Sequence, residues 1–163
     1  MSPATSPMLS FATPTGRFNA RAAAVIVDDG WVLLHQLEGD SVWSLPGGRI
    51  EAGETAGDAV RRELREELNA EVVCGELAFM VENFFEWDGV ASHEIGLYHW
   101  ATLPPGSALL DKQRHHAGQE GPLALTFRWF TFDALKALDS FHPACLRTVP
   151  LLRGQPPLHR VQR

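Results

Sequence analysis

The chain has 163 residues, of which 45% are hydrophobic and 21% are charged, and its formal net charge at pH 7 is −6. This length and apolar content are sufficient for one domain with its own core. The acidic balance and the lack of a basic patch argue against a nucleic-acid polymer as partner. No apolar run approaches the roughly 20 residues that a membrane-spanning helix needs, so we expect no membrane partner.

The two ends of the chain differ in composition from its centre. Residues 1–18 are rich in Ser, Pro and Thr and show no basic segment followed by an apolar one, so we expect a flexible N-terminal arm and no secretory signal. Residues 153–163 are polar and basic, and we expect a flexible C-terminal tail. Residues 19–152 are left as the folded domain. Cys74 and Cys145 match no metal or redox spacing, which is typical of reduced thiols in a cytoplasmic protein.

The domain is predicted to begin with a β-hairpin. Residues 22–27 are apolar and residues 31–37 are mostly so, and the turn signal Asp28-Asp29-Gly30 lies between them. A shaped loop follows, in which Pro46 fixes one backbone angle. Gly47 and Gly48 in this loop admit conformations and close approaches that a Cβ would block. The loop leads into a predicted helix that starts at Glu54 or Thr55, where threonine can act as N-cap.

Apolar residues recur at four-residue spacing after this loop, at positions 60, 64 and 68. This spacing predicts an amphipathic helix. Glu63, Glu66 and Glu67 lie three and four residues apart, so their carboxylates share one side of that helix. They gather near its C-terminal end, where the macrodipole disfavours anions and like charges repel. The arrangement favours a divalent-metal site, and a solvated helix laced with ion pairs is the competing interpretation.

Strands and a long loop are predicted beyond the acidic helix. Residues 71–85 and 92–102 have strand-like composition and flank the turn signal Trp87-Asp88-Gly89. Residues 103–121 contain two prolines and three glycines and are predicted to form a long loop, a kind of segment that is often functional. A strand is predicted at residues 123–130, and a helix with Asp133 as cap at residues 133–138. A further helix is predicted at residues 145–152.

One combination of residues resembles the signature of the Nudix (MutT-like) hydrolases. It consists of Gly48, five residues, Glu54, seven residues, and the segment Arg62-Glu63-Leu64-Arg65-Glu66-Glu67. Every acidic position of the signature is filled. Asn69 stands where the family has glycine, and asparagine also tolerates the left-handed conformation at a helix end. The resemblance covers about residues 19 to 152 and implies an α/β fold, an α/β/α sandwich around a mixed β-sheet.

The resemblance also implies a metal site and a reaction. Gly48, through its carbonyl, and Glu63, Glu66 and Glu67, through their carboxylates, are the expected ligands of Mg²⁺ or Mn²⁺. Hard oxygen donors of this kind suit magnesium. The expected reaction is attack of metal-activated water on a phosphorus of a nucleoside diphosphate derivative or nucleoside triphosphate. Glu66 and Glu67 are expected to be catalytic, together with Glu120 as a further metal ligand or general base; the competing candidates are Glu82, Glu86 and Glu94.

Further positions are expected to orient the site or to contact the substrate. By the resemblance, Arg62 pairs with Glu54 and orients the metal ligands. Arg49 is a candidate phosphate contact, and an ordinary exposed arginine is its plainer interpretation. Trp43 is a candidate for stacking on a nucleobase. Further aromatic candidates in or near predicted loops, with core packing as the default for the first two, are Phe84, Phe85 and Trp87.

Two other functional classes compete with this hydrolase. The first is a Nudix-like sensor that binds a nucleotide or an ADP-ribose compound without cleaving it. Such sensors tend to lose signature glutamates or to carry a DNA-binding module, and this sequence shows neither feature. The second is a protein or RNA interaction module, against which the acidic balance argues. The sequence carries no further specificity motif, so the expected partner is a small-molecule nucleotide, and the resemblance adds the expectation of a homodimer.

Overall fold

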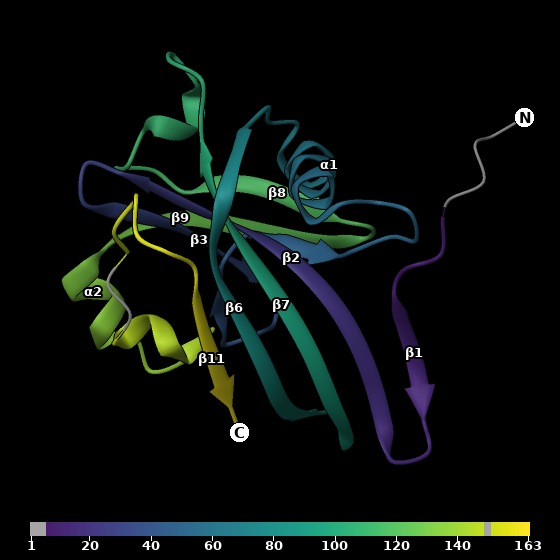
Figure 1. The fold of residues 1–163 in the computed structure, drawn as a ribbon. Helices are drawn as coiled ribbons and strands as arrows, with labels where there is room; N and C mark the ends of the chain where they lie inside the picture. The colour runs from purple at the N-terminus through teal and green to yellow at the C-terminus, as the bar shows by residue number, and fades with distance from the viewer. Residues whose placement is uncertain (1–5, 149–150) are drawn as a thin grey trace, which may run out of the picture.

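The computed structural model describes residues 6–148 and 151–163. These residues form two α-helices, two short 3-10 helices and eleven strands, which build one mixed sheet (Figure 1). The helices are α1 (Ala56–Leu68), α2 (Phe132–Ala137), η1 (Ala108–Leu110) and η2 (Ala144–Arg147). The strands are β1 (Ser10–Thr13), β2 (Gly16–Asp28), β3 (Trp31–Leu37), β4 (Trp43–Ser44), β5 (Gly47–Arg49), β6 (Val73–Trp87), β7 (Val90–Thr102), β8 (His116–Glu120), β9 (Leu123–Thr131), β10 (Phe141–His142) and β11 (Leu158–Gln162).

The main path of the sheet runs in the order β10-β4-β3-β2-β7-β6-β11. Strands β1 and β5 pair with β2, and β9 pairs with both β3 and β8. The pairs β2–β7, β6–β11 and β4–β10 are parallel, and the other pairs are antiparallel. The sheet is therefore mixed, as expected.

The central strand β2 separates two hydrophobic cores. Because side chains alternate across a strand, Ala22, Ala24 and Ile26 pack with the apolar face of α1. Ala23 and Val25 belong to the other core, which includes side chains of α2 and η2. Helices thus cover both faces of the sheet, and the predicted α/β/α arrangement is confirmed (Figure 1).

Most predicted elements are present, and three predictions need correction. The hairpin β2–β3 and the pair β6–β7 occur where the sequence places them. Helix α2 is capped by Thr131, whose hydroxyl accepts a hydrogen bond from the Ala134 N–H at 3.1 Å, and not by Asp133. The predicted helix at 145–152 is the short η2, and positions 149–150 lie outside the described residues. The predicted long loop contains η1 and β8 because the β8 backbone pairs with β9.

Parts of both predicted flexible ends are paired with the sheet. Strand β1 lies in the predicted N-terminal arm and pairs with β2, while positions 1–5 of that arm lie outside the described residues. Strand β11 lies in the predicted tail and runs parallel to β6. Leu158 packs against the core that contains α2, so both backbone pairing and apolar burial hold the tail. No helix in the described part of the chain is long and apolar enough to cross a membrane.

Helix α1 begins and ends at the residues that the sequence indicates. The Thr55 hydroxyl accepts a hydrogen bond from the Asp58 N–H at 3.2 Å, as an N-cap does. Asn69 adopts a left-handed conformation with φ of 50°, and its N–H bonds to the Arg65 carbonyl at 2.9 Å. The Ala70 N–H bonds to the Leu64 carbonyl at 3.2 Å. Asn69 therefore does the work that glycine does at many helix ends.

This helix end supplies a first prediction. Replacing Asn69 by alanine should lower the free energy of unfolding by about 1 kcal/mol, because a Cβ residue without a compensating polar side chain is strained at positive φ. Asn69→Gly should leave stability unchanged or raise it by up to about 1 kcal/mol. Urea unfolding followed by circular dichroism measures both variants. An alanine variant as stable as the glycine variant would contradict the left-handed cap.

Candidate active site

Two glycines bring strand β5 against β2 and against helix α1. Gly47 has φ of 153°, and a Cβ on it would lie 2.1 Å from the Ala22 carbonyl oxygen and 2.5 Å from the Ala23 Cα. A Cβ on Gly48 would lie 2.2 Å from Oε1 of Glu63. Only glycine leaves room for the backbone at the first position and for the carboxylate at the second. The loop thus seats its backbone directly beside the acidic helix.

Arg62 joins the acidic groups of the helix and the loop. Its guanidinium donates hydrogen bonds to Glu54 at 2.8 and 3.0 Å, to Glu63 at 2.8 Å and to Glu66 at 3.3 Å. It also donates to the Arg49 carbonyl at 3.0 Å. The hydrogen bond to Glu54 is the largest cause of a raised pKa of Arg62; burial opposes this shift, and the Glu63 carboxylate adds to it. The expected Arg62–Glu54 pair is therefore present, and its orienting role is supported by these contacts.

The Arg62 cluster leads to a second prediction. Replacing Arg62 by methionine should lower the free energy of unfolding by about 2–3 kcal/mol, because it leaves the buried Glu63 carboxylate without its donor. Arg61→Met is the matched control. Arg61 pairs with the exposed Asp58, and loss of such a surface pair changes stability by less than about 1 kcal/mol. If both substitutions lower the free energy of unfolding equally, the Arg62 cluster contributes no more to stability than the exposed Arg61–Asp58 pair does.

The three helix carboxylates have different environments. Glu63 and Glu67 are only 8% and 5% exposed, whereas the Glu66 side chain is largely exposed. Burial raises the pKa of Glu63, and the hydrogen bond from Arg62 opposes this shift. Burial raises the pKa of Glu67 to about 8; Arg21 opposes the shift, and Glu120 and Glu66 add to it. Two of the predicted metal ligands are thus carboxylates held out of water.

Glu67 faces a histidine that the sequence does not single out. Oε2 of Glu67 lies 3.5 Å from Nδ1 of His35, and neither atom has a hydrogen-bond partner in the part of the chain that the structure describes. Burial, assisted by Arg21, lowers the pKa of His35 to about 3, so this imidazole is neutral. The pair is therefore a contact between two desolvated groups and not a formed ion pair. A buried carboxylate oxygen without a partner is an unusual feature that calls for an additional partner.

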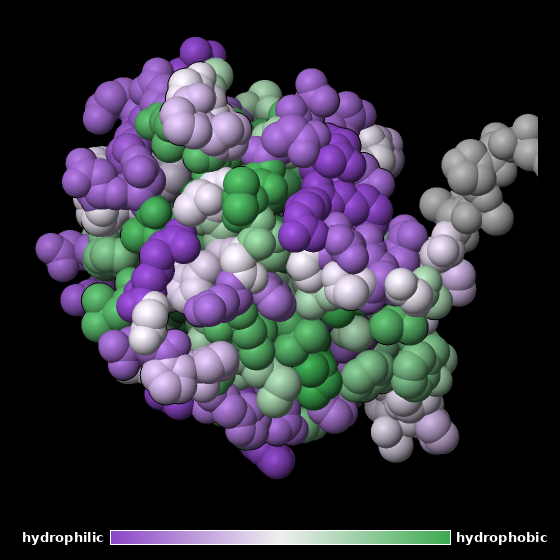
Figure 2. Space-filling view, turned by 45° about the horizontal axis from the view of Figure 1, so that its top comes forward, coloured by the Kyte–Doolittle hydropathy of each residue, from purple (hydrophilic) through white to green (hydrophobic). Residues whose placement is uncertain are grey.

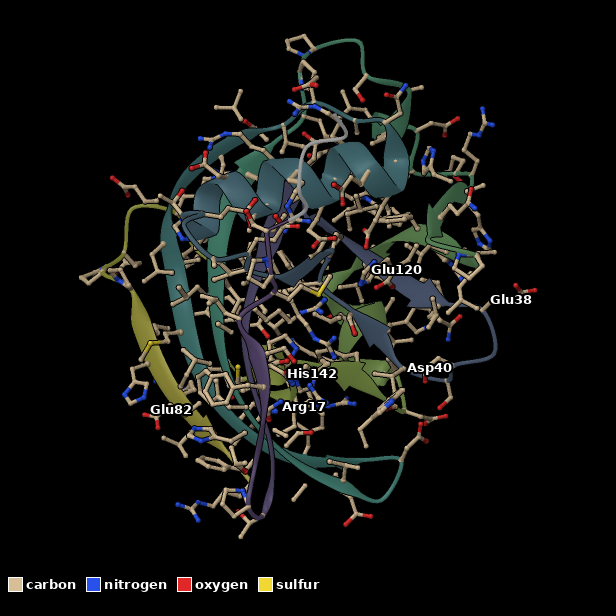
Figure 3. All side chains as sticks on the ribbon, turned by 90° about the vertical axis from the view of Figure 1, so that its right-hand side faces the viewer. Arg17, Glu38, Asp40, Glu82, Glu120 and His142 are labelled. Carbon is tan, nitrogen blue, oxygen red and sulfur yellow. The ribbon has the colours of Figure 1, made fainter. Side chains whose placement is uncertain are left out.

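His35, which contacts Glu67 of the acidic helix, lines a cavity of about 460 Å³. On the helix side this cavity is lined by His35, Gly47 and Glu120. Glu120, at the end of β8, is close enough to raise the pKa of Glu67, and Figure 3 shows it beside the helix. Glu94 lines the same cavity and is buried, so it keeps its place as a competing carboxylate. Hydrophilic side chains gather on the surface over α1, next to apolar patches on the same face (Figure 2).

The two predicted substrate contacts lie in different surroundings. Arg49 lines a neighbouring cavity of about 340 Å³ together with Arg17 and Arg21, so its phosphate contact stays a prediction. Trp43 packs edge-on against Phe130, with ring centroids 4.9 Å apart, and belongs to the periphery of the hydrophobic core. It is not among the residues that line the cavity, and its stacking on a nucleobase stays a prediction. Phe85 and Trp87 do line it.

Three residues at this site escape sequence reasoning. Arg21 donates hydrogen bonds to the carbonyls of Gly47 at 2.9 Å and Leu45 at 3.4 Å and so holds the glycine loop. His35 lies in an apolar strand, and His142 lies in the two-residue strand β10. None of them belongs to a motif, and only the pairing of distant strands brings them to the cavity. Within the described ranges, no three His, Cys, Asp or Glu side chains already converge as a metal-binding group.

Comparison with known proteins agrees with the geometry. A family model described as NUDIX domain matches residues 17–151. The CTP pyrophosphohydrolase of Escherichia coli (strain K12) is 43% identical over 99 residues, covering 58% of this chain and 69% of that protein. A NUDIX hydrolase structure from Nitrosomonas europaea has a TM-score of 0.59 at 17% identity and covers 100% of this chain and 98% of that chain. A MutT structure from Bacillus halodurans has a TM-score of 0.57 at 24% identity and covers 79% and 78%.

The two solved structures and the family model support different conclusions. The two structures are 24% and 17% identical to this chain, so their similarity shows the fold alone. The family model spans most of the described chain and includes the whole acidic helix and glycine loop. The chain therefore belongs to the Nudix family and is a hydrolase that acts on phosphorus-containing acid anhydrides.

Proposed function

We propose that the protein is a Mg²⁺-dependent pyrophosphohydrolase, with Mn²⁺ as an alternative ion, and that its substrate is a nucleoside triphosphate or a nucleoside diphosphate derivative. One observation carries this proposal. The carboxylates of Glu63, Glu66 and Glu67 lie on α1, with Glu63 against Gly48 and Glu67 against His35, and His35, Gly47 and Glu120 line a cavity of about 460 Å³. A cavity of this size is within the range of small-molecule sites.

The residues of this site fit a divalent cation, the kind of cofactor that Nudix hydrolases use. Oε2 of Glu67 is buried without a hydrogen-bond partner among the described residues, and the absence of a Cβ at Gly48 lets the Glu63 carboxylate lie against the loop backbone. Carboxylate and carbonyl oxygens are the donors that Mg²⁺ prefers. Gly48, Glu63, Glu66 and Glu67 would hold the ion. When bound, it supplies charge neutralisation of phosphate oxygens and acidification of water.

The chain's own side chains prepare the site for this chemistry. Arg62 holds Glu63 and Glu66 while Glu54 fixes Arg62, so the carboxylates keep their orientation. Glu120 lines the cavity close to Glu67 and is positioned to accept a proton or to bind the cation. Arg49 and Arg17 provide positive charge at the neighbouring cavity, where it would attract a phosphate.

One relative is named CTP pyrophosphohydrolase. The first compounds to test are therefore nucleoside triphosphates, and CTP in particular. Turnover of CTP, the other nucleoside triphosphates and ADP-ribose should be measured with Mg²⁺, with Mn²⁺ and with a chelator. We expect hydrolysis that requires the added metal, with a nucleoside monophosphate among the products. Hydrolysis in ¹⁸O-labelled water then reveals which phosphorus is attacked.

Two outcomes of this experiment would overturn the proposal. Calorimetric binding of a nucleotide or ADP-ribose without any product would identify the non-hydrolysing sensor instead. Turnover that the chelator leaves unchanged would remove the role of the acidic helix. The homodimer and the cytoplasmic location stay predictions, which sedimentation analysis and cell fractionation can test.

A further inference from the structure

Side chains from strands at opposite ends of the sheet order contact each other beside the cavity. Strand β10 stands at one end of the main path of the sheet, and β6 and β11 stand at the other. His142 of β10 nevertheless lies within hydrogen-bond distance of Asn83 of β6, with 2.8 Å between Nε2 and Asn83 Nδ2. Gln162 of β11 reaches Asn83 at 3.3 Å and the Cys145 backbone at 3.0 Å. Side chains thus connect the C-terminal strand to a residue that lines the cavity.

The hydrogen bonds from the Cys145 N–H through Gln162 and Asn83 to His142 form a relay. The direction of every hydrogen bond in this relay follows from the Cys145 N–H. The Cys145 N–H can only donate, so the Gln162 atom facing it is the acceptor Oε1. The other amide atom of Gln162 is then the donor Nε2, which faces Oδ1 of Asn83. Asn83 consequently offers its Nδ2 donor to His142. Asn83 is only 3% exposed, so it has little opportunity to exchange these partners for water.

The relay determines which imidazole nitrogen of His142 carries the proton. Because Nε2 faces a donor, it must be the unprotonated acceptor, and the neutral ring carries its hydrogen on Nδ1. Burial, with help from Arg21, lowers the pKa of His142 to about 4, which agrees with a neutral ring. Nδ1 makes no hydrogen bond to the residues that the structure describes, and His142 is only partly buried. His142 therefore presents one N–H donor of fixed direction.

We propose that this Nδ1–H of His142 reads an acceptor atom of the substrate's nucleobase, and that Gln162 and Asn83 are positioning residues that hold the required tautomer. The proposal rests on the proposed function and goes further by assigning the base contact. His142 is part of the cavity wall that also contains Phe85 and Trp87, and the Phe85 and His142 ring centroids lie 6.1 Å apart. Aromatic faces of this kind suit a base.

Charge and position argue for a base and against a phosphate at this end of the cavity. Asp40 and Glu86 line the same cavity and would repel an anionic group. Arg21 adds positive charge to the cavity, but its guanidinium is held at the glycine loop, where it donates to the carbonyls of Leu45 and Gly47. Figure 3 shows His142 farther from α1 than Glu120 is, so a substrate with its phosphates at the acidic helix would extend its nucleoside portion toward His142.

Single-atom changes in the relay test the tautomer without any turnover. In Gln162→Glu both terminal atoms are acceptors, so Asn83 should turn its amide, face His142 with Oδ1 and move the proton to Nε2. Asn83→Asp should have the same effect directly. Nitrogen-15 NMR of the imidazole at about pH 8, above the ordinary carboxyl pKa, distinguishes protonated from unprotonated ring nitrogens. We expect Nδ1–H in the wild type and Nε2–H in both variants.

His159→Gln provides a matched control on the same strand. His159 contacts Glu82 at 2.7 Å on the outside of the β6–β11 pair and takes no part in the relay. This variant should keep the wild-type tautomer of His142. A wild-type ring that carries its proton on Nε2 would overturn the proposal, as would relay variants that leave the ring unchanged.

Ligand binding tests whether the donor contacts the base. Calorimetry with Mg²⁺ should show that Gln162→Glu and Asn83→Asp weaken CMP binding about fivefold to tenfold, the loss expected for one hydrogen bond. Pyrophosphate binding should not change, and KM for CTP should rise with little change in kcat. Equal loss for CMP and pyrophosphate would assign His142 to a phosphate and overturn the base contact. If the wild type binds neither compound and cleaves no nucleotide, the proposed function fails together with the base contact, while NMR still decides the tautomer.

Discussion

Replacing Glu67 by glutamine should remove most of the activity and at the same time stabilise the fold. The expected loss in kcat/KM is about two to four orders of magnitude, because a site carboxylate contributes several kcal/mol to such a reaction. The expected gain in the free energy of unfolding at pH 7.5 is about 1–3 kcal/mol. The gain arises because Glu67 is 5% exposed and its Oε2 has no hydrogen-bond partner within residues 6–148 and 151–163.

The gain in stability should depend on pH in a defined direction. Folding raises the pKa of Glu67 to about 8, from an ordinary value of 4.5. Between these two values the unfolded chain loses this proton while the folded chain keeps it, so wild-type stability falls as pH rises through this window. Glutamine has no proton to lose. The stability difference between Glu67→Gln and the wild type should therefore grow from pH 4.5 to 8 and then level off.

Steady-state kinetics and urea unfolding at several pH values test both halves of this prediction. Glu71→Gln is the control, since Glu71 is an exposed partner of Arg65 just beyond the helix. This substitution should change kcat/KM less than about twofold and stability by less than about 1 kcal/mol. A Glu67→Gln variant that keeps wild-type turnover would remove the carboxylate from the mechanism. A variant that is less stable than the wild type would show that the carboxylate is well paired.

The adjacent glycines of the loop should respond differently to alanine, the first mainly in stability and the second mainly in activity. Gly47→Ala should lower the free energy of unfolding by about 3 kcal/mol or more, because its Cβ would strike the β2 backbone and its φ of 153° is strained for alanine. In Gly48→Ala the Cβ would meet the Glu63 carboxylate, which is the end of a flexible side chain. We expect a loss of about 1 kcal/mol in stability and about a hundredfold in kcat/KM, since a 1 Å misplacement of a catalytic group has effects of this size.

Each variant serves as the control for the other. Thermal unfolding measures the stability of both, and calorimetric titration with Mg²⁺ measures metal affinity. Gly48→Ala should bind Mg²⁺ more weakly at temperatures where it is fully folded. If instead both variants lose stability equally and bind metal equally well, then Gly48 acts only in packing and its place beside Glu63 has no functional meaning.

Local sequence patterns were sufficient for the acidic helix and its ends. The four-residue spacing of Val60, Leu64 and Leu68 determines which face is buried, and neighbouring residues provide the caps at Thr55 and Asn69. Interactions of this kind span only a few residues, so the pattern and the structure agree. The contact between Gly48 and Glu63 was also foreseeable, because the resemblance to the Nudix signature connects the loop to the helix.

Other features depend on which strands lie side by side. Trp43 lies next to a turn-rich segment, and only the position of β9 reveals that it packs on Phe130. The predicted C-terminal tail is polar in composition, yet Leu158 is apolar and β6 has an edge with which β11 can pair. Hydrogen bonds between backbones carry no side-chain signature, so sequence reasoning could not identify this partner.

The amino-acid sequence by itself determined the family, the α/β class, the acidic helix and the carboxylates that it presents, because these depend on residues within a few turns of one another. Only the tertiary structure decided that Arg21, His35 and His142 share a cavity with Glu120, and that Gln162 sets the hydrogen-bond direction at His142. These residues come from five different strands. Their proximity results from the register and curvature of the whole sheet, which no local spacing encodes.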